Sequence, residues 1–178
     1  ASEQLRNDRK IVMEAVKQDD WAFRCASEQL KSDREFVMEV VKQNGCGDAL
    51  QYISEQLKNE REFVMEVVKH SGHALQYASE QIRNNREFVM EALKQAPKQN
   101  WKHKGLMLRY ASEQLKNDRE FVMEVVKHSG NAFQYASEQL RNDREFVMEV
   151  LKQNGWALYY SSEQLKNDRE FVMEVVKH

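Results

Sequence analysis

Histidine and cysteine carry the side chains of this chain that are best suited to binding a metal ion. His70 and His73 lie three residues apart, and His128 repeats the position of His70 in a later copy of the same segment. A structural zinc ion takes about four ligands, and no cysteine or carboxylate completes such a set with these histidines. Cys25 and Cys46 occupy non-equivalent positions, so they form neither a repeated disulfide framework nor a metal quartet. We expect two buried or idle thiols, no metal and no cofactor.

A histidine beside a serine could activate the hydroxyl as a nucleophile. His70 precedes Ser71, and His128 precedes Ser129. Each serine is followed by glycine at the end of an expected helix, where a turn or a helix cap accounts for it. We therefore expect no catalytic residue and no enzyme activity. If the chain serves an enzyme, it does so as an accessory module beside a catalytic domain elsewhere.

The chain is one unit of about 25 residues written seven times, each copy beginning near Ala-Ser-Glu-Gln-Leu. A fixed period of this size predicts a stack of supersecondary units, because so short a unit cannot enclose a core alone. The expected fold is all-α, an α-solenoid of about seven two-helix repeats over residues 1–178. The pattern starts and stops within a unit, so we expect a fragment of a longer protein. The units begin at Ala1, Ala26, Ile53, Ala78, Ala111, Ala136 and Ser161.

The fifth unit shows the helices most clearly. Asn117 is expected to cap a helix, with Glu120 three residues later completing a capping box. Apolar residues within 121–126 form one face of this helix. Gly130 is expected to end it by adopting a positive φ, and a second, weaker helix is expected over 132–140. Helices of about ten residues do not persist alone in water, so neighbouring units must stabilise them.

Composition restricts the classes of function. Charged residues make up 31% of the chain and apolar residues 41%, with a formal net charge of -2. This balance lacks the basic excess of a non-specific nucleic-acid binder, so nucleic acid is an unlikely partner. No run approaches the roughly 20 apolar residues of a membrane span, and no signal peptide is recognisable. A soluble intracellular compartment is the default expectation.

The consensus of the copies resembles a family of tandem helical repeats known only as a domain of unknown function. The best-fitting run extends from Leu140 to Leu165 and includes Asn-Asp-Arg-Glu-Phe-Val at 142–147 and Lys-Gln-Asn-Gly-Trp-Ala-Leu at 152–158. The resemblance covers essentially the whole chain. It implies a repeat fold and an array module, and it brings no catalytic or ligand-binding residue onto this sequence.

Variation among the copies is concentrated between the last lysine of the long helix and the next tyrosine. Helix interiors are fixed by packing, whereas turns along one edge of a stack can differ without breaking it. This edge is either a binding surface or a set of turns that diverged freely after duplication. At one such position the copies carry Trp21, His73, Asn131 and Trp156.

The longest insertion, residues 95–109, is the strongest single candidate for a binding site. It contains Pro97, which breaks the helical period, and it is basic: the fourth unit has a net charge of +4 and the other six together have -6. The insertion either contacts an acidic protein, a phosphate or a lipid headgroup, or it is a solvated loop whose tryptophan packs on the stack. Its candidate residues are Lys98, Trp101, Lys102, His103, Lys104 and Arg109.

The leading hypothesis is a non-catalytic scaffold that binds other proteins along this edge, as a segment of a larger assembly. The alternative is a nucleic-acid reader, since helical repeats can address successive bases with one or two side chains each. The sequence identifies neither the partner nor the oligomeric state.

Overall fold

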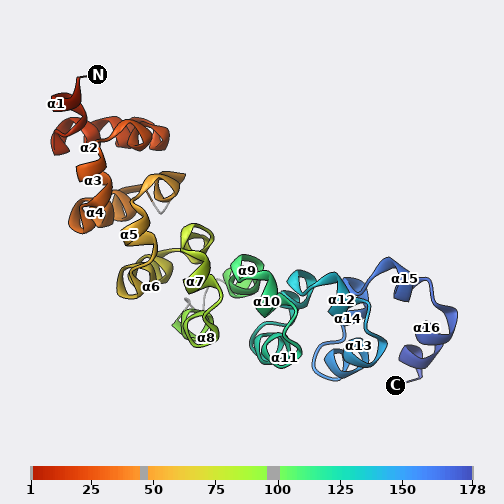
Figure 1. The fold of residues 1–178 in the computed structure, drawn as a ribbon. Coiled ribbons are helices and arrows are strands. Elements are labelled where there is room, and N and C mark those ends of the chain that lie inside the picture. The colour runs from red at the N-terminus through yellow and green to blue at the C-terminus, as the bar shows by residue number, and fades with distance from the viewer. Residues whose placement is uncertain (1, 45–47, 96–100, 178) are drawn as a thin grey trace. The chain divides into compact units, whose positions relative to one another are not determined.

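The computed structural model describes residues 2–44, 48–95 and 101–177, with only the backbone described at 44, 48 and 101–104. Throughout these ranges the regular secondary structure is helical, which confirms the all-α class (Figure 1). The chain divides into two compact units, Ala1–Ile82 and Arg83–His178. Each compact unit is described by itself below.

Every repeat opens with an α-helix of about one turn, built from Glu-Gln-Leu or Glu-Gln-Ile. A serine caps it: Ser112 Oγ accepts a hydrogen bond from the Leu115 amide at 3.2 Å. Serine is favoured there because its side chain satisfies an amide that has no partner within the helix. These helices are α1 (Glu3–Arg6), α3 (Glu28–Ser32), α5 (Glu55–Lys58), α7 (Glu80–Arg83), α10 (Glu113–Lys116), α12 (Glu138–Arg141) and α15 (Glu163–Lys166).

A longer α-helix follows after one or two intervening residues. Its cap in the fifth repeat is Asp118, whose carboxylate accepts from the Phe121 amide at 2.9 Å. The prediction that Asn117 starts this helix and forms a capping box with Glu120 was wrong, because Asn117 is the C-cap of α10. The long helices are α2 (Arg9–Gln18), α4 (Arg34–Asn44), α6 (Arg61–His70), α8 (Arg86–Gln95), α11 (Arg119–His128), α13 (Arg144–Leu151) and α16 (Arg169–Val176).

The second helix predicted for each repeat is divided in two. In the fifth repeat a 3₁₀ helix ends at Tyr135, Ala136 is extended with φ -61° and ψ 159°, and Ser137 then caps a new helix. The 3₁₀ segments are η1 (Asp20–Cys25), η2 (Asp48–Tyr52), η3 (Gly72–Tyr77) and η4 (Gly130–Tyr135); in the fourth and sixth repeats their place is taken by the α-helices α9 (Trp101–Tyr110) and α14 (Ala157–Tyr160).

Glycine at the turn has a different role from the one predicted. Helix α11 ends at His128, and Gly130 opens η4 rather than stopping the helix with a positive φ. A Cβ on Gly130 would lie 2.5 Å from Nδ2 and 2.7 Å from Cγ of Asn154 in the next repeat. A side chain at this position would therefore displace Asn154, and Gly130 permits the close approach of two neighbouring turns.

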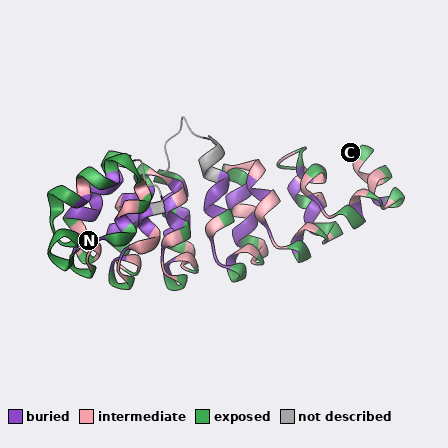
Figure 2. Cartoon of the chain, turned by 90° about the horizontal axis from the view of Figure 1, so that it is seen from above, coloured by how far each residue is buried: buried purple, intermediate pink, exposed green. Residues whose placement is uncertain are grey.

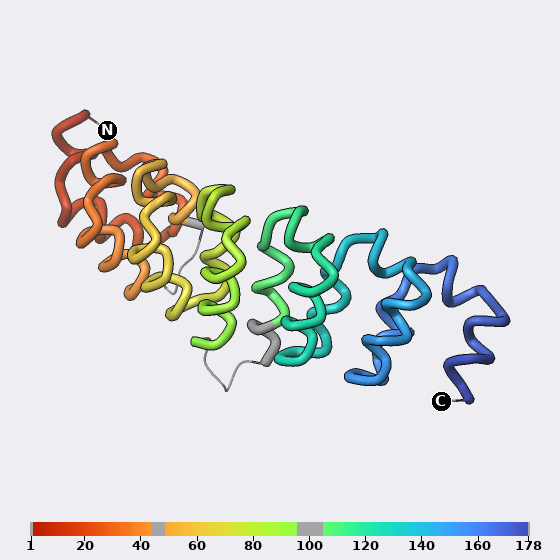
Figure 3. Tube along the Cα trace, turned by 60° about the horizontal axis from the view of Figure 1, so that its bottom comes forward, coloured from red at the N-terminus to blue at the C-terminus, as the bar shows by residue number. Residues whose placement is uncertain are grey.

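Within each compact unit the core lies where successive long helices meet the 3₁₀ segments. Figure 2 shows buried residues on the facing sides of the helices and exposed residues on the outer turns, and Figure 3 follows the successive turns of the chain. Burying one phenylalanine contributes roughly 1.5 to 3 kcal/mol. The largest fully buried rings are Phe23, Phe36 and Phe63 in the first compact unit and Phe88, Phe121, Phe133, Phe146 and Phe171 in the second.

Adjacent repeats are joined by a backbone hydrogen bond that recurs along the chain. The capping serine donates its N–H to the carbonyl of the last residue, or next to last, of the preceding short helix, at 2.8 to 3.0 Å. Its hydroxyl also donates to the asparagine that follows that helix, as from Ser137 to Asn117 at 2.6 Å. The backbone pairs are Ser27 with Arg6, Ser54 with Lys31, Ser79 with Lys58, Ser112 with Arg83, Ser137 with Lys116 and Ser162 with Arg141.

An arginine at the start of the long helix forms a second junction. Arg119 reaches the next repeat at Asp143 (3.0 Å) and Glu149 (3.2 Å), with its guanidinium carbon 4.8 Å from the Phe146 ring centroid. The hydrogen bond to Glu174 raises the pKa of Arg144 above its ordinary value. The other pairs are Arg9 with Asp33 and Glu39, Arg34 with Glu60 and Glu66, Arg86 with Asp118 and Glu124, and Arg144 with Asp168 and Glu174.

The junction between the second and third repeats departs from this pattern and gives a first prediction. Ser32 stands in place of the asparagine, and its hydroxyl donates to the Glu28 carbonyl at 2.8 Å instead of receiving the Ser54 hydroxyl. Ser32→Asn should supply that acceptor and raise the free energy of unfolding by about 1 kcal/mol, as measured by urea denaturation. The reciprocal change, Asn117→Ser, should lower it by a similar amount. No gain with Ser32→Asn would contradict this account of the junction.

The arginine junction gives a second prediction. A double-mutant cycle with Arg119→Gln and Glu149→Gln should yield a coupling free energy of about 0.5 to 1 kcal/mol at low salt, because both side chains are partly exposed. The coupling should decrease in about 1 M salt, where charges are screened. A coupling of zero at low salt would exclude the pair as a contributor to stability.

Candidate interaction site

The variable turn position identified from the sequence carries an exposed side chain in two repeats and a half-buried side chain in two others. Trp21 and Trp156 are exposed, at 52% and 69%. Asn131 is half-buried, and its Oδ1 accepts from Ser129 Oγ at 2.5 Å. His73 is also half-buried. The two tryptophans are therefore available to a partner, whereas Asn131 shapes its own turn.

The basic insertion is only partly described. Lys98 lies outside the described residues, and Trp101, Lys102, His103 and Lys104 belong to α9, where only the backbone is described. The prediction of a loop was wrong from residue 101 onward, because α9 is a regular helix. Arg109 is exposed, and its guanidinium carbon lies 5.5 Å from the Tyr110 ring centroid and 5.9 Å from that of Tyr135.

An aromatic cluster in the sixth repeat was only partly anticipated. The ring centroids of Trp156 and Tyr159 are 6.4 Å apart, those of Tyr159 and Tyr160 are 5.2 Å apart, and both pairs are nearly perpendicular. Tyr159 is 69% exposed, and Lys166 Nζ lies 5.8 Å from its ring centroid. The signal for Tyr159 was present in the sequence, since three other repeats have glutamine there: Gln51, Gln76 and Gln134.

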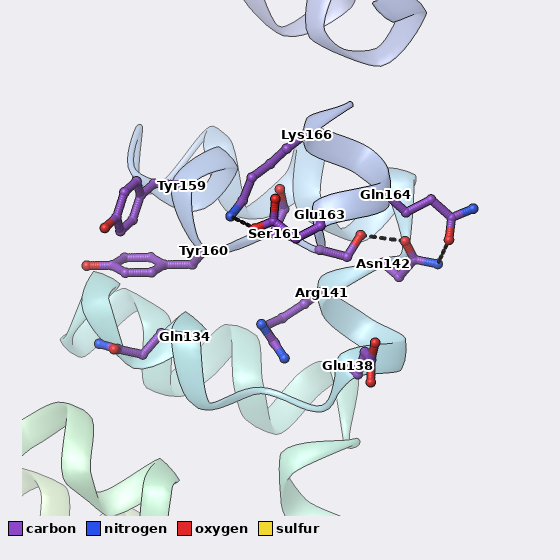
Figure 4. A pocket seen from close by; sticks show the side chains of 11 residues that line it. Gln134, Glu138, Arg141, Asn142, Tyr159, Tyr160, Ser161, Glu163, Gln164 and Lys166 are labelled. Carbon is purple, nitrogen blue, oxygen red and sulfur yellow. Dashed lines mark hydrogen bonds and ion pairs between the residues drawn. The ribbon is translucent and has the colours of Figure 1, made fainter. Parts of the chain in front are cut away.

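The aromatic cluster borders a pocket between the sixth and seventh repeats, with a volume of about 400 Å³. Figure 4 shows the Arg141 guanidinium directed away from Glu138. Arg141 Nε donates to the Ala136 carbonyl at 3.2 Å, which fixes the side chain. Lys166 pairs with Glu163 at 2.7 Å.

An equivalent pocket of about 350 Å³ lies between the first and second repeats. It is lined by residues at the same repeat positions, among them Arg6, Ser27 and Lys31. Arg24 stands in place of Tyr159, so this pocket has a further cation at that position. The shared feature is an arginine at the end of the upstream short helix, and the difference is the aromatic border.

Among the described residues, no group of three or more His, Cys, Asp or Glu side chains could hold a metal ion. In the same ranges, no helix is long and apolar enough to cross a membrane.

Comparison with known proteins gives one match. The family model described as domain of unknown function (DUF4116) matches six overlapping segments, at residues 1–31, 8–58, 33–73, 60–100, 102–141 and 143–178. No curated protein and no solved structure matches the chain.

The turn that carries Trp156 depends on the glycine contact, and this gives a third prediction. Asn154 Oδ1 accepts from the Trp156 amide at 3.2 Å, and the same side chain packs against Gly130. Gly130→Ala should lower the free energy of unfolding by about 1 to 2 kcal/mol, because the added methyl displaces Asn154. Gly155→Ala is the matched control, since its Cβ would meet no atom within 4 Å. Equal effects of the two changes on urea denaturation would contradict this assignment.

Proposed function

The chain belongs to the family described as domain of unknown function (DUF4116), and we propose that it is a non-catalytic scaffold that binds another protein along its turns. The binding site we propose is the aromatic cluster of Trp156, Tyr159 and Tyr160 with the adjoining pocket. The exposure of Trp156 and Tyr159, both at 69% on a framework of packed helices, carries this proposal.

Tryptophan and tyrosine are the side chains that contribute most often to the binding energy of protein interfaces. They offer a large contact area with few rotatable bonds, so ordering them on binding costs little conformational entropy. In this chain the neighbouring Ala157 is fully buried. The cluster is therefore presented by a segment whose backbone is anchored in the core.

The charges around the cluster favour a protein over a nucleic acid. Arg141 and Lys166 lie beside Glu138 and Glu163 in the pocket lining. A surface that tracks a phosphate backbone needs an excess of positive charge, whereas mixed charges suit the side chains and amides of a peptide. Nucleic-acid binding is retained as an outcome of the test below.

The test is site-specific photo-cross-linking in the full-length protein, in extract from its source. A benzophenone side chain at position 159 should link to one defined protein, and the matched control is the same group at position 145, which is exposed on α13. Trp156→Ala should abolish the link. Nuclease-sensitive products at 159 would favour the nucleic-acid alternative, and equal labelling from both positions would contradict the proposal.

Once that protein is purified, Trp156→Ala combined with Tyr159→Ala should weaken binding by at least about tenfold, the effect of losing one interface hot spot. Stability should change little, because both side chains are exposed. Calorimetric titration measures the first quantity and urea denaturation the second. Undiminished affinity would place the interface elsewhere.

A further inference from the structure

We propose that the pocket at Arg141 binds a carboxylate side chain of an acidic peptide, with an aromatic residue of the same peptide resting on Tyr159 and Trp156. This inference rests on the proposed function and deepens it, because it assigns a chemical class to the partner segment. It is derived from a comparison of the same position in the different repeats.

Four repeats have lysine at the position of Arg141, which is the last residue of the short helix or, in α3, the next to last, and each of these lysines already has a partner. Each of these lysines forms an ion pair with the glutamate three residues earlier, at 2.7 to 2.9 Å. The pairs are Lys31 with Glu28, Lys58 with Glu55, Lys116 with Glu113 and Lys166 with Glu163.

Arg141 stands at the equivalent position and behaves differently. Its Nε donates to the Ala136 carbonyl, and within the described ranges its two Nη groups form no ion pair with Glu138 or another carboxylate. Figure 4 shows the guanidinium turned away from Glu138, and Arg141 lines the pocket together with Tyr160. The hydrogen bond to the Ala136 carbonyl thus fixes the Arg141 side chain. Its Nη groups remain as hydrogen-bond donors at the pocket.

A carboxylate is the group that fits these donors best. The guanidinium presents parallel N–H groups that match the two oxygens of a carboxylate, and such bonds are roughly twice as strong as neutral ones. Arg141 is half-buried, which reduces the screening of the bond by water. Glu138 and Glu163 also line the pocket and would repel a polyanion, so a single acidic side chain is favoured over a nucleic-acid backbone.

The aromatic border adds a second requirement. Tyr159 and Trp156 are perpendicular and exposed, an arrangement that accepts a third ring edge-on or offset. The pocket between the first and second repeats is lined by Arg6 and Arg24, and Arg24 replaces Tyr159, although Trp21 stands at the position of Trp156. We therefore expect the Arg6 pocket to accept an acidic side chain with a weaker preference for a neighbouring ring.

The experiment uses the whole chain and two synthetic peptides, acetyl-Tyr-Glu-Tyr-amide and its analogue with glutamine in place of the glutamate. Binding is followed by NMR through the side-chain Nε–Hε resonance of Arg141 and the indole resonance of Trp156. The glutamate peptide should shift both resonances, and the glutamine peptide should bind about tenfold more weakly. Equal binding of the two peptides would overturn the proposal.

The decisive variant is Arg141→Lys, which keeps the charge. Lysine at this position is expected to pair with Glu138, as Lys116 pairs with Glu113, so affinity for the glutamate peptide should fall about tenfold. Because four repeats carry lysine there, the fold should be retained. The matched control is Arg169→Lys, at a residue that does not line this pocket, and it should leave affinity unchanged.

Full affinity in Arg141→Lys would show that charge alone attracts the peptide and would overturn the assignment of the pocket. Equal losses in Arg141→Lys and Arg169→Lys would do the same. These failures are distinguishable from failure of the proposed function, because the cross-link from position 159 to a partner protein is scored separately and does not depend on the peptide.

Discussion

The hydrogen bond between the capping serine of one repeat and the short helix of the preceding repeat is the interaction on which the rest of the structure depends. A helix of about one turn does not persist alone in water, and its last carbonyls have no partner within the helix. The Ser137 amide satisfies the Lys116 carbonyl at 2.8 Å, and the Ser137 hydroxyl binds Asn117. Each short helix is thus completed by the repeat that follows it.

The arginine junction also connects a repeat to the one that follows it. Arg119 contacts only the following repeat in the ion pairs and ring contact described above, at Asp143, Glu149 and Phe146. In both junctions, therefore, the residues that one repeat contributes differ from those that the next repeat contributes. Because these contacts lie on the short and long helices, the exposed positions of the third segment are free to vary. Tyr159 and Arg109 occupy the same one of these positions in their repeats.

The sequence was sufficient for the class and period of the fold, because apolar spacing and a repeated start signal depend on local chemistry. It was insufficient for the junctions. A serine at an N-cap and an asparagine at a C-cap give the same sequence pattern whether their side chains bond only within the repeat or also to the neighbouring repeat. The misplaced helix start at Asn117 has this cause. Gly130 was misread because a glycine needed for a close approach to Asn154 resembles one needed for a positive φ. The Arg141 pocket could not be predicted, because the sequence does not show that Lys116 pairs with Glu113 of its own helix whereas Arg141 bonds to the Ala136 carbonyl.

Amide hydrogen exchange of the capping serines tests the central claim most directly. If each serine amide is held by the preceding short helix, it should exchange at least about a hundredfold more slowly than the same amide in an unfolded peptide. Exchange at the unfolded-peptide rate would contradict the account, because it would show that the repeats are not joined through these bonds. The amides to be followed are those of Ser27, Ser54, Ser79, Ser112, Ser137 and Ser162.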